Sequence, residues 1–282
     1  MMGTADTIMV SNVGSAAISA ASLVDSLNIL VIQVFSALAA GGTIICSQYL
    51  GSHNEKEANR AATQLLFVVS IISTVIMAVC LIFNEPLLRL IFGSVEDRVM
   101  EAAKIYFFYT AISFPFIALF DGASSIFRAQ ENTKCPMIIS VISNGLNIGG
   151  NAVLIWGFDM GIAGAAIATL LSRIFCAVVV LYFLHRPGNV ISLRHLSRPD
   201  RKLIGRILSI GLPSGVENGM FQFGKLAIQS TVSTMGTVAI AAQAMTNILE
   251  NLSGIAAIGI GIGLMTVVGQ CMGGGLKEEA AY

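Results

Sequence analysis

The sequence predicts an all-α fold, a polytopic bundle of transmembrane helices, from three observations. Hydrophobic residues make up 55% of the 282-residue chain and charged residues only 11%, whereas soluble domains carry roughly 25% charged residues. Apolar runs of about 20 residues, which are long enough to cross a bilayer, recur along the whole chain. In addition, one stretch of sequence occurs twice, at a constant offset of 222 residues.

The apolar runs predict the helices in order. Residues 1–10 are too short to span a bilayer and are interpreted as half of a first helix. Full spans are predicted at 16–50, 61–83, 102–127, 137–156, 162–184, 208–234 and 240–272. The abrupt start, and an end that leaves the next helix unstarted, predict a chain that is cut at both ends.

Basic residues concentrate in alternate loops, which the positive-inside rule places in the cytoplasm. The intervening loops hold only Arg89, Arg98 and Lys104. The longest polar loop, 186–206, is predicted to be a cytoplasmic linker between a first lobe, 1–185, and the start of a second lobe, 207–282. The basic set is Lys56, Arg60, Arg128, Lys134, Arg186, Arg194, Arg198, Arg201, Lys202, Arg206 and Lys277.

The repeated stretch covers residues 10–60 and 232–282 and aligns without a gap. Both copies combine a long apolar helix with a short charged loop. Chance similarity between two helices rich in small residues is the alternative. A true duplication predicts two helix-turn-helix units around a pseudo-two-fold axis along the membrane normal. Matched identities include Gly14 and Gly236, Gly41 and Gly263, Gln48 and Gln270, Gly51 and Gly273, and Glu57 and Glu279.

Composition excludes several functions. The net charge is zero, which argues against a nucleic-acid partner. The five cysteines have no paired spacing, and the three histidines lie in predicted loops without a second ligand nearby, so no metal site is expected. An integral-membrane enzyme would need a cluster of acids or histidines at a membrane face, and no such cluster is visible. Acids on several spans also favour alternating access over a passive channel.

Several stretches, in this order, resemble the multidrug and toxic compound extrusion (MATE) transporters. They include Ala5 to Val10, the end of the second helix at Gln48 to Gly51, and the loop Phe127 to Lys134 before Pro136. Further matches are Leu146 to Ile148, Gly161 to Thr169, Gly211 to Pro213 and Gly236 to Ala242.

The resemblance implies twelve helices in two pseudo-symmetric six-helix lobes, of which this chain would lack part of helix one and helices nine to twelve. It implies an antiporter, not an enzyme, that exports drug-like, often cationic compounds in exchange for protons or sodium, with no other cofactor. We expect a monomer in the plasma membrane, the inner membrane of a bacterium. The alternative is a flippase for lipid-linked oligosaccharides, which should hold more cations than Arg173 and Lys225 to grip phosphate.

The resemblance also implies a cation-coupling site in the first lobe, formed by Asp6, Asn147 and Asn151. Asp6 lies in the motif of the first helix, and the two amides lie a turn apart on helix five. In relatives known for coupling, the position of Asn151 often holds an aspartate. One carboxylate can still carry a proton, so the asparagine disfavours sodium more than protons. The alternative is that Asp6 only caps or bonds a helix end.

Charges inside membrane spans are costly and mark further candidates. Asp25 and Asn28 share one face of a helix, and the repeat places Asn247 and Glu250 at the equivalent positions. These four residues are candidates for a cavity that receives a cationic substrate, or alternatively form polar contacts between helices. No role is assigned to Asp121 or Arg173.

Glu217, Phe221 and Lys225 recur at every fourth position and therefore form one stripe on their helix. Glu217 and Lys225 are further candidates for the substrate cavity. The alternative is a structural ion pair, because opposite charges offset each other's desolvation.

Overall fold

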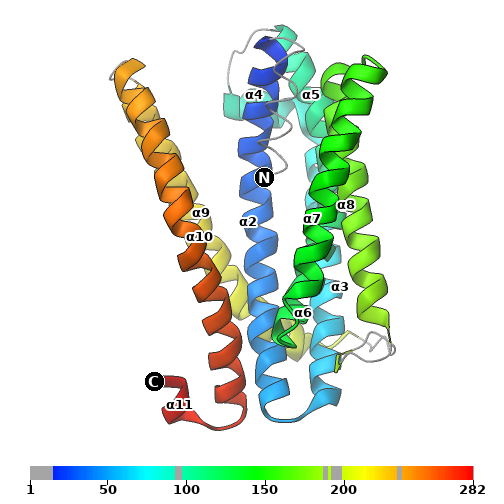
Figure 1. The fold of residues 1–282 in the computed structure, drawn as a ribbon, viewed down its shortest axis with the longest axis vertical. Coiled ribbons are helices and arrows are strands. Elements are labelled where there is room, and N and C mark those ends of the chain that lie inside the picture. The colour runs from blue at the N-terminus through cyan, green and yellow to red at the C-terminus, as the bar shows by residue number, and fades with distance from the viewer. Residues whose placement is uncertain (1–14, 93–96, 187–189, 192–198, 234–236, 282) are drawn as a thin grey trace.

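The computed structural model describes residues 15–92, 97–186, 190–191, 199–233 and 237–281, and its regular elements are all helices in these ranges. Figure 1 shows a bundle of long helices beside a pair, α9 and α10, that diverges from it toward one end. The elements are α2 (Ser15–Gly51), α3 (Glu55–Ile82), α4 (Asn84–Phe92), α5 (Asp97–Ile112), α6 (Phe114–Ala129), α7 (Lys134–Asn151), η1 (Ala152–Gly157), α8 (Gly161–His185), α9 (Arg201–Ser233), α10 (Thr237–Gly273) and α11 (Lys277–Ala281).

The all-α prediction is confirmed, and each of the seven predicted full spans overlaps helix in the structure. By length and composition, four described helices could cross a membrane, or five if one bent pair is a single span. Helix α9, which carries Glu217 and Lys225, is not among them. The half helix predicted at 1–10 lies outside the described residues.

One predicted helix, 102–127, is broken in the structure. Helices α5 and α6 meet at Ser113 and bend by 42°. Pro115 lies in the first turn of α6, where its ring and missing N–H prevent α5 from continuing through this point. The bend therefore follows from a proline that hydropathy alone does not register.

The sequence also predicted a loop for residues that are helical. Arg89 lies in α4, and Arg98 and Lys104 lie in α5. Glu85 of α4 forms an ion pair with Lys104 at 2.6 Å and a second with Arg89 at 2.9 Å. The charges that looked like loop residues therefore hold a short helix against α5. Arg201, Lys202 and Arg206, which fell in the predicted linker, are likewise in the first turns of α9.

Helix α2 lies at the centre of the molecule and packs against α3, α5, α6, α9 and α10. Its buried Phe35 meets Phe114 edge to face, with the ring centroids 6.2 Å apart. Tyr106 and Phe107 of α5 are also buried in the apolar core of the lobe. Aromatic packing of this kind stabilises the bundle in addition to the area that it buries. The first lobe is thus built around one long helix.

The two copies of the repeat have the same helix bounds. Helices α2 and α10 each span 37 residues, and their first and last residues differ by the sequence offset of 222. The helix that follows starts at Glu55 in one copy and at Lys277 in the other, again at that offset. Both long helices run in the same direction (Figure 1). The predicted duplication is confirmed in its helix boundaries and its orientation.

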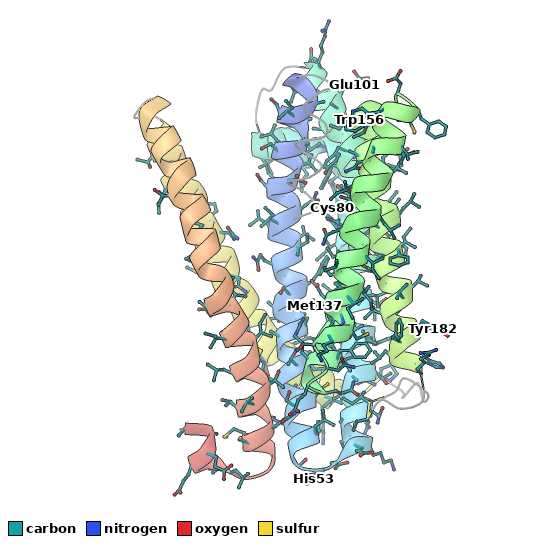
Figure 2. All side chains as sticks on the ribbon, in the orientation of Figure 1. His53, Cys80, Glu101, Met137, Trp156 and Tyr182 are labelled. Atoms are coloured by element: carbon teal, nitrogen blue, oxygen red, sulfur yellow. The ribbon has the colours of Figure 1, made fainter. Side chains whose placement is uncertain are left out.

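The loops with basic residues gather at one end of the molecule. This end, called the turn end below, holds the α2–α3 turn, the α6–α7 loop, the α10–α11 turn and residues 190–191 and 199–200. Figure 2 shows His53 at the turn end, with Glu101 and Trp156 near the opposite end. Trp156 and Tyr182 are both exposed, at 57% and 61%, as expected of aromatic side chains near membrane interfaces. The cytoplasmic location of the turn end stays a prediction.

Candidate functional site

The predicted coupling site is partly described. Asn147 and Asn151 both lie on α7 and are both fully buried, whereas Asp6 lies outside the described residues. The Asn147 side-chain amide donates a hydrogen bond to Thr169 Oγ1 on α8 at 3.1 Å. The carbonyl oxygen of the same amide is buried and has no hydrogen-bond partner among the described residues. Buried acceptors are nearly always paired, so this oxygen is an exception within the lobe.

Close packing of α7 and η1 against α8 fixes this pair of helices. A Cβ atom added at Gly150 would lie 3.2 Å from the Ala168 Cβ, and one added at Gly164 would lie 3.1 Å from the backbone of Leu154. The π-helical turn η1 follows Asn151 directly, and π-turns inside helices are frequent at functional sites. The amides of α7 are therefore held in a rigid setting.

A second polar cluster joins α2 to α5. The Tyr106 hydroxyl donates to Asp25 Oδ1 at 3.3 Å, and the Asn28 side-chain amide lies 3.5 Å from the same oxygen. Asn28 is 3% exposed, and its Oδ1 has no hydrogen-bond partner among the described residues. The polar contacts found for Asp25 and Asn28 therefore run along α2 and toward α5 in the first lobe. Their assignment to a substrate cavity stays a prediction.

The remaining cavity candidates lie on the α9–α10 pair. Glu217 is exposed on α9, and Lys225 Nζ lies 5.1 Å from the centroid of the Phe221 ring, one helical turn away. This distance allows a cation–π interaction. Asn247 and Glu250 are in α10, but their side chains lie outside the described part of the chain. That these residues share one substrate cavity with Asp25 and Asn28 stays a prediction.

Arg173, which received no role from the sequence, is buried in the first lobe and only 8% exposed. Its guanidinium donates to Ser113 Oγ at 2.6 Å, at the break between α5 and α6. Ser113 in turn donates to the Thr110 carbonyl at 2.5 Å. Arg173 thus holds the bend of the broken span from the neighbouring helix α8.

Thr169, Tyr106 and Ser113 were not predicted as site residues from the sequence. Thr169 is the last residue of the stretch Gly161 to Thr169 that resembles the family, and this resemblance was the one signal that could have identified it. Tyr106 and Ser113 gave none, because a tyrosine and a serine in apolar runs are ordinary. Among the residues that the structure describes, no three His, Cys, Asp or Glu side chains come together as metal ligands.

The two copies of the repeat cross at the turn end and contact each other reciprocally. A Cβ atom added at Gly51 would overlap with the carbonyl oxygen of Gln270, and one added at Gly273 would overlap with the carbonyl oxygen of Gln48. These are equivalent pairs under the offset of 222 residues, as expected of contacts across a two-fold axis. Ser47 faces its own counterpart, since a Cβ atom at Gly269 would lie 2.8 Å from the Ser47 Cβ.

Comparison with known proteins agrees with this arrangement. A family model described as MatE matches residues 1–153 and 213–281. The chain belongs to the MatE family. The resemblance to MATE transporters is therefore confirmed for the fold and the family, and with its several apolar helices the chain is part of a multi-pass membrane protein.

Relatives match along nearly the whole chain. The "Uncharacterized transporter YisQ" of Bacillus subtilis (strain 168) is 29% identical over 100% of this chain and 62% of its own length. The "Probable multidrug resistance protein NorM" of Thermotoga maritima is 28% identical over 99% of this chain and 61% of its own length. The chain therefore spans about three fifths of these relatives.

Solved structures also match the fold of this chain. The structure described as "Crystal structure of MATE in the bent conformation" has a TM-score of 0.91 and 23% identity, and it covers 99% of this chain and 63% of the solved chain. A likeness at this level of identity establishes the fold. It thus supports the arrangement of α2 to α11 described above.

Proposed function

We propose that this chain forms the first lobe and the start of the second lobe of an antiporter that exports drug-like, cationic organic compounds in exchange for protons or sodium. The observation that carries the proposal is the reciprocal crossing of α2 and α10. The two repeats meet at the turn end through Gly51 and Gly273 and diverge toward the other end (Figure 1). Alternating access needs such a pair of equivalent halves that rock against each other.

The names of relatives support the substrate class. The NorM protein of Thermotoga maritima is named a multidrug resistance protein, and the MepA protein of Staphylococcus aureus a multidrug export protein. Both align with most of this chain, at 28% and 22% identity. We place the protein in the bacterial inner membrane, as a monomer.

We favour export of drugs over flipping of lipid-linked oligosaccharides. A cavity that grips phosphate needs cationic side chains free to reach it. Arg173 is buried in the first lobe and donates to Ser113. One of the two candidate cations is therefore already engaged and does not serve to bind phosphate.

The coupling residues proposed for the first lobe are Asp6, Asn147 and Asn151. The two amides on α7 are buried, and that of Asn147 bonds to Thr169 on α8, which fits a site that binds and releases a cation as the lobe changes shape. The test is ethidium efflux from everted vesicles that carry the complete natural protein, driven by an imposed proton or sodium gradient. Asp6→Asn should abolish gradient-driven efflux, and Asp159→Asn, in an exposed turn, should leave it intact. Equal efflux in Asp6→Asn and parent would contradict the assignment.

A further inference from the structure

Asp25, Asn28 and Tyr106 bring three oxygen-bearing side chains together between α2 and α5. Asp25 and Asn28 are three residues apart on α2, so their side chains share a face. The Tyr106 hydroxyl, 3.3 Å from Asp25 Oδ1, reaches that face from α5. Tyr106 is 1% exposed, so the cluster closes against the interior of the lobe.

The Asn28 amide is only half satisfied. Its Nδ2 lies 3.5 Å from Asp25 Oδ1. Its Oδ1 is buried, and no residue that the structure describes donates a hydrogen bond to it. Buried acceptors are nearly always paired, so an acceptor left open beside a carboxylate calls for a bound species that is positively charged or donates hydrogen bonds.

We infer that Asp25, Asn28 and Tyr106 form a binding site for a small monovalent metal cation of the size of sodium. Carboxylate, amide and hydroxyl oxygens are hard ligands, which suit hard cations and not transition metals. A single positive charge matches the single negative charge of the Asp25 carboxylate, which favours a monovalent over a divalent ion inside the lobe. The Asn28 Oδ1 supplies a ligand that nothing else in the described structure uses.

This site is separate from the amides of α7. Asn147 is paired with Thr169 on α8, whereas Asp25 and Asn28 lie on α2 and meet α5. The first lobe therefore has two polar clusters, each with a buried, open amide oxygen. Binding at Asp25 requires no transport and does not rest on the proposed antiport.

The test is equilibrium binding of radiolabelled Na⁺ to the complete natural protein, purified in detergent, with Li⁺ and K⁺ as competitors. We expect saturable binding in the parent and the loss of one binding equivalent in Asp25→Asn. Tyr106→Phe should weaken the affinity by about threefold, and Asn28→Asp should tighten it, because a second carboxylate faces the ion. Asp159→Asn is the matched control. It changes the same side chain at an exposed turn position with φ of 52°, a conformation that asparagine tolerates.

Two results would overturn the inference. One is a parent with no saturable binding of Na⁺, Li⁺ or K⁺, and the other is an Asp25→Asn variant that binds the same number of ions as the parent. If Asp25→Asn does not fold, the opposite effects expected for Tyr106→Phe and Asn28→Asp still decide the question. Efflux measured in parallel separates the two proposals. Export without a cation at Asp25 refutes only this site, and a cation at Asp25 without export refutes only the transport function.

Discussion

Arg173 shows how a buried charge can be accommodated inside the first lobe. Its guanidinium lies at the break between α5 and α6, where Ser113 accepts its hydrogen bond at 2.6 Å. A break in a helix leaves polar groups unsatisfied inside the lobe, and hydrocarbon offers them no partner. Arg173 therefore stabilises the bend through its hydrogen bond to Ser113.

Replacing Ser113 by alanine should test this interpretation. Ser113→Ala leaves the buried guanidinium without that acceptor, which should destabilise the protein by about 1–3 kcal/mol. The control is Ser209→Ala, which removes an exposed hydroxyl that bonds to the Arg206 carbonyl at 2.9 Å, at a cost within about 0.5 kcal/mol. Thermal unfolding in detergent measures both. Equal stability of the two variants would show that Arg173 does not depend on Ser113.

At the scale of single residues, the sequence predicted which side chains share a helix face but not which partners they have. Asn147 and Asn151 lie a turn apart on α7, as their spacing predicted, and both are buried. The partner of Asn147, Thr169, could not be deduced, because its contact joins two helices whose relative rotation the sequence does not define. The same holds for Asp25, whose spacing from Asn28 was evident but whose contact with Tyr106 depends on how α2 packs against α5.

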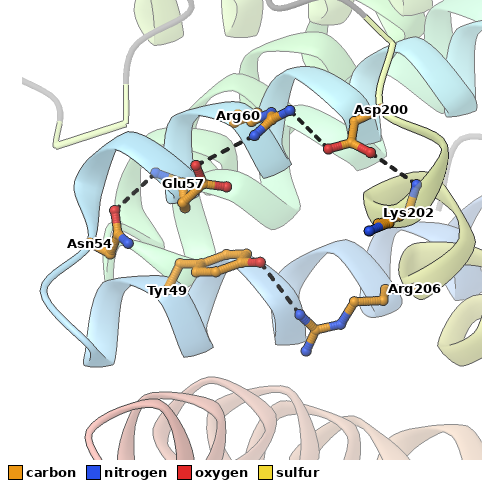
Figure 3. A network of polar contacts seen from close by, with 7 residues as sticks. All are labelled: Tyr49, Asn54, Glu57, Arg60, Asp200, Lys202 and Arg206. Atoms are coloured by element: carbon orange, nitrogen blue, oxygen red, sulfur yellow. Dashed lines mark hydrogen bonds and ion pairs between the residues drawn. The ribbon is translucent and has the colours of Figure 1, made fainter.

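Helix α9 begins with a well-defined cap. Asp200 accepts a hydrogen bond from the Lys202 backbone N–H at 2.9 Å, as N-cap residues do. It also forms an ion pair with Arg60 of α3 at 2.9 Å, and its own N–H donates to the Gln64 side chain at 3.1 Å. Figure 3 shows how this residue joins the start of α9 to the first turns of α3.

Asp200→Ala should therefore destabilise the start of α9 by about 1–2 kcal/mol, mainly through the lost cap. Asp200→Asn keeps a capping oxygen and loses only the charge. It should cost less than about 1 kcal/mol, because Arg60 and Asp200 are both partly exposed. Hydrogen exchange of the amides of residues 201–206 gives the measurement. Similar exchange in the two variants would assign the stabilisation to the ion pair.

Helix α4 is held on α5 by charge, which makes its docking sensitive to pH. The hydrogen bond from Lys104, and then that from Arg89, lower the pKa of the Glu85 carboxyl below its ordinary value of 4.5. A lowered folded-state pKa means that the stabilisation is fully present above pH 4.5 and is lost as the pH falls through the lowered value.

Hydrogen exchange of residues 84–92 should reveal that dependence. Above pH 4.5, Glu85→Gln should exchange faster than the parent, since it lacks the charged partner of Lys104. The difference should shrink below pH 4.5 and disappear once the pH has fallen through the lowered pKa of Glu85, where the parent becomes protonated. Glu101→Gln, at an exposed position of α5, is the control and should match the parent throughout. A difference between parent and Glu85→Gln that persists at low pH would contradict the assignment.

Long apolar runs predicted the helices, because a bilayer leaves the backbone few other ways to satisfy its hydrogen bonds. The interruptions were harder to predict. The break at Ser113 depends on Pro115, yet Pro213 lies inside the continuous helix α9. Helix α4 is short and carries charges, so it resembled a loop. The break between α5 and α6 and the docking of α4 depend on local packing and on ion pairs between segments. A hydropathy profile contains neither.

On the scale of the whole molecule, the crossing of α2 and α10 depends on two glycines. Gly51→Ala and Gly273→Ala should each destabilise the contact between the lobes, because the added methyl group meets backbone that cannot move aside. The double variant should cost less than the sum of the two, since both changes separate the same pair of helices.

Gly263→Ala is a control for which we expect the opposite effect on stability. Nothing lies within 4 Å of a Cβ atom at this position of α10, so alanine should stabilise the helix by roughly 0.5–1 kcal/mol. Thermal unfolding in detergent compares the four variants. A Gly51→Ala or Gly273→Ala variant that is as stable as Gly263→Ala would show that the crossing does not constrain these positions.

The contact of Ser47 with Gly269 has a consequence for how such a protein can evolve. A residue on a two-fold axis faces its own copy, so a homodimer must place the same side chain on both sides. Two serines would crowd this crossing, where even one Cβ atom at position 269 would lie 2.8 Å from the Ser47 Cβ. Once both halves are encoded in one gene, each side can mutate separately, and serine opposite glycine becomes an available solution. Fusion of the two halves thus permits the two helices to approach more closely at the axis than in a symmetric dimer with serine on both sides.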